Sequence, residues 1–167
     1  MQNLLRADGS LFEDGWVLLA RDATAVDLPD GDVIVPLALW RAEREALLAR
    51  GTRLGLRLAS DEVPEAIVED LPCFALLAID FPVFSDGRGY SSARILRERL
   101  GFSGELRAVG DVLRDQIFLM RRCGFDSFAL REDRPAAGAV GALKDFSNAY
   151  QQAGVDPGPA LIRRSAG

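Results

Sequence analysis

From residue 32 onward, the pattern of apolar and polar residues alternates between that of strands and that of helices. Five short apolar runs have the length of strands, at residues 32–35, 53–59, 73–79, 105–109 and 127–131. Between these runs, apolar residues recur every three or four positions, as on the buried face of a helix. The alternation predicts an α/β fold, and we expect a compact three-layer αβα domain with a mainly parallel five-stranded sheet.

The first thirty residues have a different pattern. Two Asp-Gly pairs, beginning at Asp8 and Asp14, lie between short apolar runs, as in the tight turns of antiparallel hairpins. The sequence Pro29-Asp30-Gly31 then predicts a turn before the first βα unit. We therefore expect an N-terminal hairpin ribbon at residues 1–31, packed on an α/β domain at 32–154, with a loose tail at 155–167.

Within the α/β domain, two polar residues are expected to begin helices. Ser91 precedes an apolar stripe that stops at Gly101, and Asp111 precedes one that stops at Gly124. Serine and aspartate are common N-caps, and glycine commonly follows a helix end. The run at 73–79 is apolar throughout, which predicts a central strand covered on both faces.

Charge and hydropathy exclude several classes of partner. The 167-residue chain carries a net charge of −5 and has a sequence pI of about 4.8, which argues against nonspecific binding of nucleic acid or anionic lipid. No apolar run approaches the roughly 20 residues that span a bilayer. The first residues lack the basic and apolar regions of a signal peptide, so we expect a cytoplasmic protein.

The chain contains no histidine, which excludes histidine-based acid–base catalysis and histidine metal ligands. Its two cysteines, Cys73 and Cys123, cannot complete an Fe–S cluster or a four-cysteine zinc site. Both lie near apolar runs, so we expect two buried, reduced thiols, as in a reducing compartment. We expect no metal and no bound cofactor.

The candidate site lies where parallel strands end, because ligands of α/β proteins bind at the carboxyl ends of the strands. Loops at 80–90, 110–111 and 131–134 should meet there. The Gly-x-Gly sequence in the first loop lacks the third glycine of a dinucleotide-binding fingerprint. We predict an anion- or partner-binding edge that includes Asp86, Gly87, Arg88, Gly89, Tyr90, Ser91, Arg107 and Arg131.

Two arginines of this edge, Arg88 and Arg107, also have a structural interpretation. Asp86-Gly87 can form a tight turn in which Arg88 pairs with a neighbouring carboxylate. Arg107 interrupts a strand-like run, and a buried arginine requires a partner. That partner is either a bound oxyanion or a carboxylate, with Glu105, Asp111 and Asp80 as the candidates.

Six short segments between residues 81 and 126 form a recognisable set. They are Phe81-Pro82, Ser85-Asp86-Gly87-Arg88-Gly89-Tyr90-Ser91, Leu96-Arg97-Glu98-Arg99, Gly104-Glu105-Leu106-Arg107-Ala108, Gly110-Asp111-Val112-Leu113-Arg114-Asp115-Gln116 and Arg122-Cys123-Gly124-Phe125-Asp126. With these segments the chain resembles bacterial domain-of-unknown-function family 934, whose members are associated with sulfite reduction. The resemblance covers roughly residues 30–150. It implies a gene position beside the haemoprotein subunit of sulfite reductase, and it implies no catalytic residues.

Three functional hypotheses follow. The first is an accessory protein of assimilatory sulfite reduction that binds the sulfite reductase haemoprotein, its electron donor or a small oxyanion. The second is a small enzyme for an anionic substrate, with Asp86 or Asp111 as base and Arg88 as anion clamp. The third is a structural homo-oligomer. No residue pattern for flavin or nicotinamide binding supports an independent redox enzyme.

Overall fold

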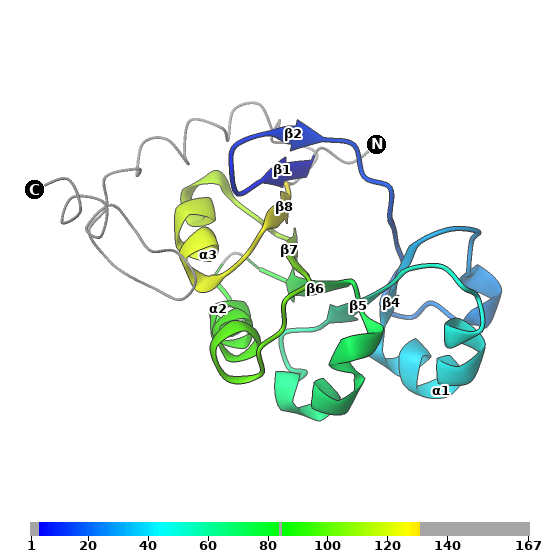
Figure 1. The fold of residues 1–167 in the computed structure, drawn as a ribbon. Helices are drawn as coiled ribbons and strands as arrows, with labels where there is room; N and C mark the ends of the chain where they lie inside the picture. The colour runs from blue at the N-terminus through cyan, green and yellow to red at the C-terminus, as the bar shows by residue number, and fades with distance from the viewer. Residues whose placement is uncertain (1–3, 84, 131–167) are drawn as a thin grey trace, which may run out of the picture.

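The computed structural model describes residues 4–83 and 85–130, and these residues form one eight-stranded sheet with helices beside it (Figure 1). The spatial order of the strands is β2-β1-β8-β7-β6-β5-β4-β3. Strands β3 to β8 pair in parallel, whereas β1 pairs antiparallel with both β8 and β2. The strands are β1 Leu4–Arg6, β2 Leu11–Phe12, β3 Val17–Leu18, β4 Val33–Pro36, β5 Leu54–Leu58, β6 Leu76–Phe81, β7 Glu105–Gly110 and β8 Ser127–Ala129.

The five strands expected from residue 32 onward are confirmed as β4 to β8, but the sheet has eight strands rather than five. The additional strands come from the N-terminal residues. The hairpin of β1 and β2 is confirmed, and Gly9 takes a φ of 89° in its turn. The prediction of a second hairpin turn at Asp14-Gly15 is wrong. Here the chain crosses to the opposite edge of the sheet, where β3 pairs in parallel with β4.

This crossing shows that the sheet curls. Strands β2 and β3 lie at opposite edges, yet only residues 13–16 join them. An extended chain advances at most about 3.6 Å per residue, so Phe12 and Val17 are at most about 18 Å apart. Eight strands spaced about 4.8 Å apart would span about 34 Å if the sheet were flat. The two edges therefore approach each other, and residues 13–16, here called the closing segment, bridge them.

The described helices pack on one face of the sheet. Sequential strands are neighbours, and crossovers between parallel strands are almost always right-handed, so successive helices fall on the same side. Trp40, Leu71, Leu96 and Met120, from four different helical segments, share one apolar cluster. The expected three-layer αβα arrangement is therefore wrong, because the described helices form a single layer on one face of the sheet. The helical segments are η1 Ala25–Asp27, α1 Leu37–Leu48, η2 Pro64–Cys73, α2 Arg88–Arg94, the π-helical η3 Ile95–Arg99, η4 Arg114–Gln116 and α3 Ile117–Cys123.

The opposite face, here called the inner face, carries charge. Side chains alternate between the two faces of a strand. Ile34, Ala78 and Val109 form a second apolar cluster there, against which Trp16 of the closing segment packs. Alternate strand positions add polar side chains to this face, and several are buried. They are Arg57, Asp80, Glu105, Arg107 and Ser127.

Two expected helix starts are wrong. Helix α2 begins at Arg88 with Gly87 as its N-cap residue, so Ser91 lies inside the helix. The carboxylate of Asp86 accepts the backbone N–H of Arg88 at 3.1 Å, which satisfies one of the free donors at this helix start. After β7, the 3-10 segment η4 begins at Arg114 rather than next to Asp111. The predicted stop at Gly124 is confirmed, with a φ of 110°.

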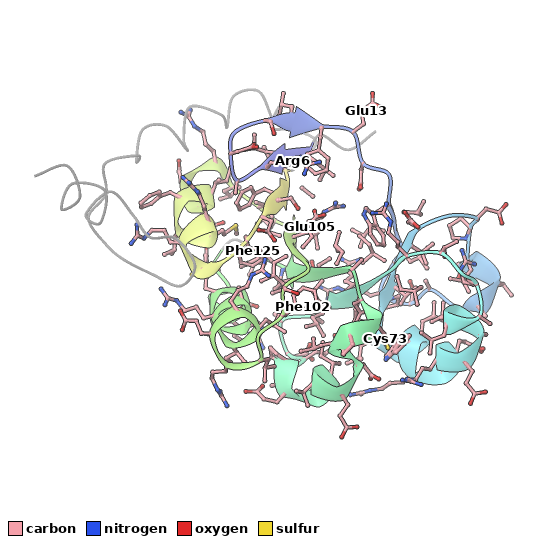
Figure 2. The ribbon with its side chains drawn as sticks, viewed as in Figure 1. Arg6, Glu13, Cys73, Phe102, Glu105 and Phe125 are labelled. Atoms are coloured by element: carbon pink, nitrogen blue, oxygen red, sulfur yellow. The ribbon has the colours of Figure 1, made fainter. Side chains whose placement is uncertain are left out.

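Both cysteines are unpaired, and their environments differ. Cys123 is buried, as expected, but Cys73, the last residue of η2, is half-buried (Figure 2). Among residues 4–83 and 85–130, no helix has both the length and the apolar character needed to cross a membrane. The end of the expected α/β domain, from residue 131, and the tail at residues 155–167 lie outside the described residues.

Candidate functional site

The carboxyl ends of β5, β6 and β7 lie side by side, and the segments that follow these strands form one edge of the sheet, here called the carboxyl edge. Asp86 and Arg88 lie at this edge, directly after β6. Arg88 Nη2 donates to Ser60 Oγ at 2.9 Å, which ties the loop after β6 to the segment after β5. Arg131, with the rest of the 131–134 loop, lies outside the described residues.

Asp86 and Arg88 pair with each other. Arg88 Nε donates to Oδ1 at 3.0 Å and Nη2 donates to Oδ2 at 2.7 Å, in bidentate geometry. The Asp86 side chain is 8% exposed, whereas that of Arg88 is 60% exposed. Hydrogen bonds from the Arg88 side chain and backbone hold the pKa of Asp86 well below its usual range. The carboxylate therefore fixes the direction of an exposed guanidinium and is itself a weak base.

Gly89 and Tyr90 have packing roles. A Cβ at Gly89 would lie 2.5 Å from the Phe81 ring, so only glycine allows the helix to approach the end of β6 this closely. The Tyr90 ring meets the Phe81 ring edge-on, with centroids 5.4 Å apart, and burial raises the pKa of its hydroxyl. Gly87, by contrast, faces open space, and Ser91 is exposed.

Arg107 is buried on the inner face, with 2% of its side chain exposed. Its Nη1 donates to both carboxylate oxygens of Asp14 at 3.0 Å, and its Nη2 donates to Glu105 Oε1 at 2.9 Å. Glu105 was one of three expected partners, and Asp14 was not foreseen. Arg107 thus holds the closing segment against the sheet.

A second group of charges lies where β6 ends, and we call it the Asp80 cluster. Asp80 is 2% exposed, and its Oδ2 accepts from Arg57 Nη2 at 3.1 Å and from Arg21 Nε at 2.7 Å. Arg21 Nη2 also pairs with the same oxygen. Arg57 Nη1 donates to the carbonyl oxygen of Leu19 at 3.1 Å. Two arginines from different parts of the chain therefore share one carboxylate.

The backbone of β7 lies close beside this cluster. Gly110 has a φ of 93°, and a Cβ there would lie 2.6 Å from Asp80 Oδ1 and 2.5 Å from the carbonyl oxygen of Phe81. A side chain at Gly110 would therefore displace Asp80. The next residue, Asp111, is attached to β6 through its backbone N–H, which donates to Phe81 O at 2.7 Å.

Two residues of the Asp80 cluster, Arg57 and Arg21, were not predicted from the sequence. Arg57 interrupts the apolar strand β5 as Arg107 interrupts β7, so the same signal was present for both arginines. Arg21 lies between β3 and η1, where no periodic pattern marks it. Asp80 was expected at this edge. Among residues 4–83 and 85–130, no three acidic or cysteine side chains are grouped to hold a metal ion.

A comparison with protein families identifies the family of the chain. The family described as "Bacterial protein of unknown function (DUF934)" matches residues 55–161. The chain belongs to this family. The DUF934 match includes residues 86–91, Arg57, Asp80 and Arg107, whereas Asp14 and Arg21 lie before it. Searches of curated proteins and of solved structures find no match to this DUF934 member.

Proposed function

We propose that this DUF934 protein is an accessory protein of assimilatory sulfite reduction and acts by binding, through the carboxyl edge around Asp86 and Arg88. Its partner is the haemoprotein subunit of sulfite reductase or the electron donor of that enzyme. The pathway and the partner come from the sequence resemblance. The observation that supports binding is an exposed arginine that is already fixed in position.

Arg88 has the properties of an interface residue. Asp86 and Ser60 restrain it in the free protein, so binding costs less side-chain entropy than it would for a free arginine. Its Nη1 makes no hydrogen bond to a described residue, which leaves donors for a partner carboxylate. Val83 in the same loop is exposed and adds apolar area. Arginine is enriched among residues that dominate binding energy at interfaces.

The enzyme hypothesis receives less support from this edge. A general base needs a free lone pair and a pKa near the working pH. Both oxygens of Asp86 accept hydrogen bonds from Arg88, and the pKa of Asp86 is lowered. Asp111, beside Gly110, is the other proposed base and stays the alternative.

The test is capture of partners by the tagged full-length protein from its native host. We expect the sulfite reductase haemoprotein among the captured proteins, its loss with Arg88→Ala, and its retention with Arg99→Ala. Arg99 is a suitable control because it is also exposed and also forms an ion pair, with Glu65 at 3.2 Å, but lies on η3. Absence of the haemoprotein, or equal capture by the Arg88→Ala variant, would contradict the proposal.

A further inference from the structure

We infer that Arg21 and Arg57 form a binding site for a small inorganic oxyanion at the carboxyl edge, with Asp80 orienting both guanidinium groups. The inference rests on the charge and hydrogen bonding of the Asp80 cluster. It does not depend on the proposed role in sulfite reduction. The charge and geometry of the Asp80 cluster determine which anion binds there, and they are independent of any partner that binds at Arg88.

The charges of the cluster do not balance. Among the ion pairs of the described residues, Asp80 is the one carboxylate shared by two arginines. All the hydrogen bonds from Arg21 and Arg57 to Asp80 fall on Oδ2, although arginine–carboxylate pairs frequently use both oxygens. Within this cluster, one carboxylate therefore serves two cations, at the edge where α/β proteins bind ligands.

Hydrogen-bond donors are also left over. Arg57 Nε is buried and has no partner among the described residues, which is unfavourable for a cationic donor. Arg21 Nη1 makes no hydrogen bond to a described residue. The Arg21 side chain is 51% exposed, so a ligand can reach the cluster from its side. An anion there can accept from Arg21 Nη1, and it lies beside the positive charge of Arg57.

Arg107, on the same face of the sheet, shows how a buried arginine with a purely structural role is satisfied by its partners Asp14 and Glu105. Arg107 has two carboxylate partners, and its Nε, Nη1 and Nη2 all donate hydrogen bonds. Arg57 has a share of one carboxylate, one backbone carbonyl and one unused donor. This contrast favours a ligand at the Asp80 cluster over a purely structural role for its arginines.

The experiment titrates the full-length protein with sodium sulfate, sulfite or phosphate at constant ionic strength, with chloride as the balancing salt. We expect a saturable rise in Tm with at least one oxyanion, because a ligand that binds only the folded state stabilises it. A parallel calorimetric titration gives the Kd. Arg21→Ala should weaken binding about 10- to 200-fold, the range expected when one charge-assisted hydrogen bond is lost.

Three further variants make the result decisive. Arg53→Ala removes an exposed arginine that pairs with Asp32 away from this cluster, and it should bind as the wild type does. Arg57→Lys keeps the charge but loses the planar fork, and it should bind more weakly while remaining folded. A response to oxyanions no larger than the response to chloride, or unchanged binding by Arg21→Ala, would overturn the inference. Arg88→Ala should keep oxyanion binding, which separates this site from the proposed partner contact.

Discussion

Asp14 and Arg107 are 93 residues apart in the chain and form the buried ion pair that holds the closing segment to the sheet. Each carboxylate oxygen lies 3.0 Å from Arg107 Nη1. A buried charge that loses its partner is strongly destabilising, because its desolvation is no longer compensated. The pair therefore fixes how the two edges of the curled sheet meet.

The first prediction tests this ion pair. Asp14→Asn should lower the free energy of unfolding by about 3 kcal/mol, at the low end of the effect of breaking a buried pair, because Glu105 still contacts Arg107. Urea unfolding followed by tryptophan fluorescence measures the change. Asp32→Asn is the matched control. It breaks the exposed pair with Arg53, which should cost much less because solvent screens that pair. Equal losses in the two variants would show that Asp14 has no special role.

The second prediction concerns the two glycines beside Arg88. Gly89→Ala should destabilise the protein by about 1–3 kcal/mol, because its methyl group would overlap the buried Phe81 ring. Gly87→Ala should change the free energy of unfolding by about 0.5 kcal/mol or less, since that position faces open space with a φ of −82°. Thermal unfolding of both variants decides the matter. A tolerated Gly89→Ala would mean that the helix does not pack on Phe81 as described.

The third prediction concerns acid stability. The folded-state pKa of Asp86 is lowered, so its ion pair with Arg88 stabilises the fold at pH values above the unfolded pKa of about 3.9. This contribution should shrink as the pH falls below about 3.9 and vanish below the folded-state pKa. The Tm difference between wild type and Arg88→Ala should therefore be constant above about pH 5 and decrease toward pH 2. A difference that stays constant over this whole range would contradict the assigned pairing.

The βα alternation could be predicted because each helix and each strand from residue 32 onward has a local periodic pattern. The path of the closing segment could not. Asp14-Gly15 looks locally like a hairpin turn, and the residue that decides its path, Arg107, lies far along the chain. The order of the strands in the sheet also cannot be predicted from the periodicity of apolar residues. An apolar strand such as β6 has the same pattern whether its second face is covered by helices or by the inner-face cluster of a curled sheet.

The site was predictable in part, for a similar reason. The pairing of Asp86 with Arg88 is local, and it was one of the two interpretations that the loop sequence allowed. The Asp80 cluster joins three distant segments, so no short motif encodes it. Arg57 carried a usable signal, a charge inside an apolar strand, whereas Arg21 becomes recognisable only once β3 is placed beside β4.

Growth on different sulfur sources tests the central claim most directly. In a host with one copy of the gene, a clean deletion should fail to grow with sulfate as the sole sulfur source and should recover with cysteine. The wild-type gene and Arg99→Ala should restore growth on sulfate, whereas Arg88→Ala, expressed at the same level and folded, should not. Normal growth of the deletion strain on sulfate would contradict a role in assimilatory sulfite reduction.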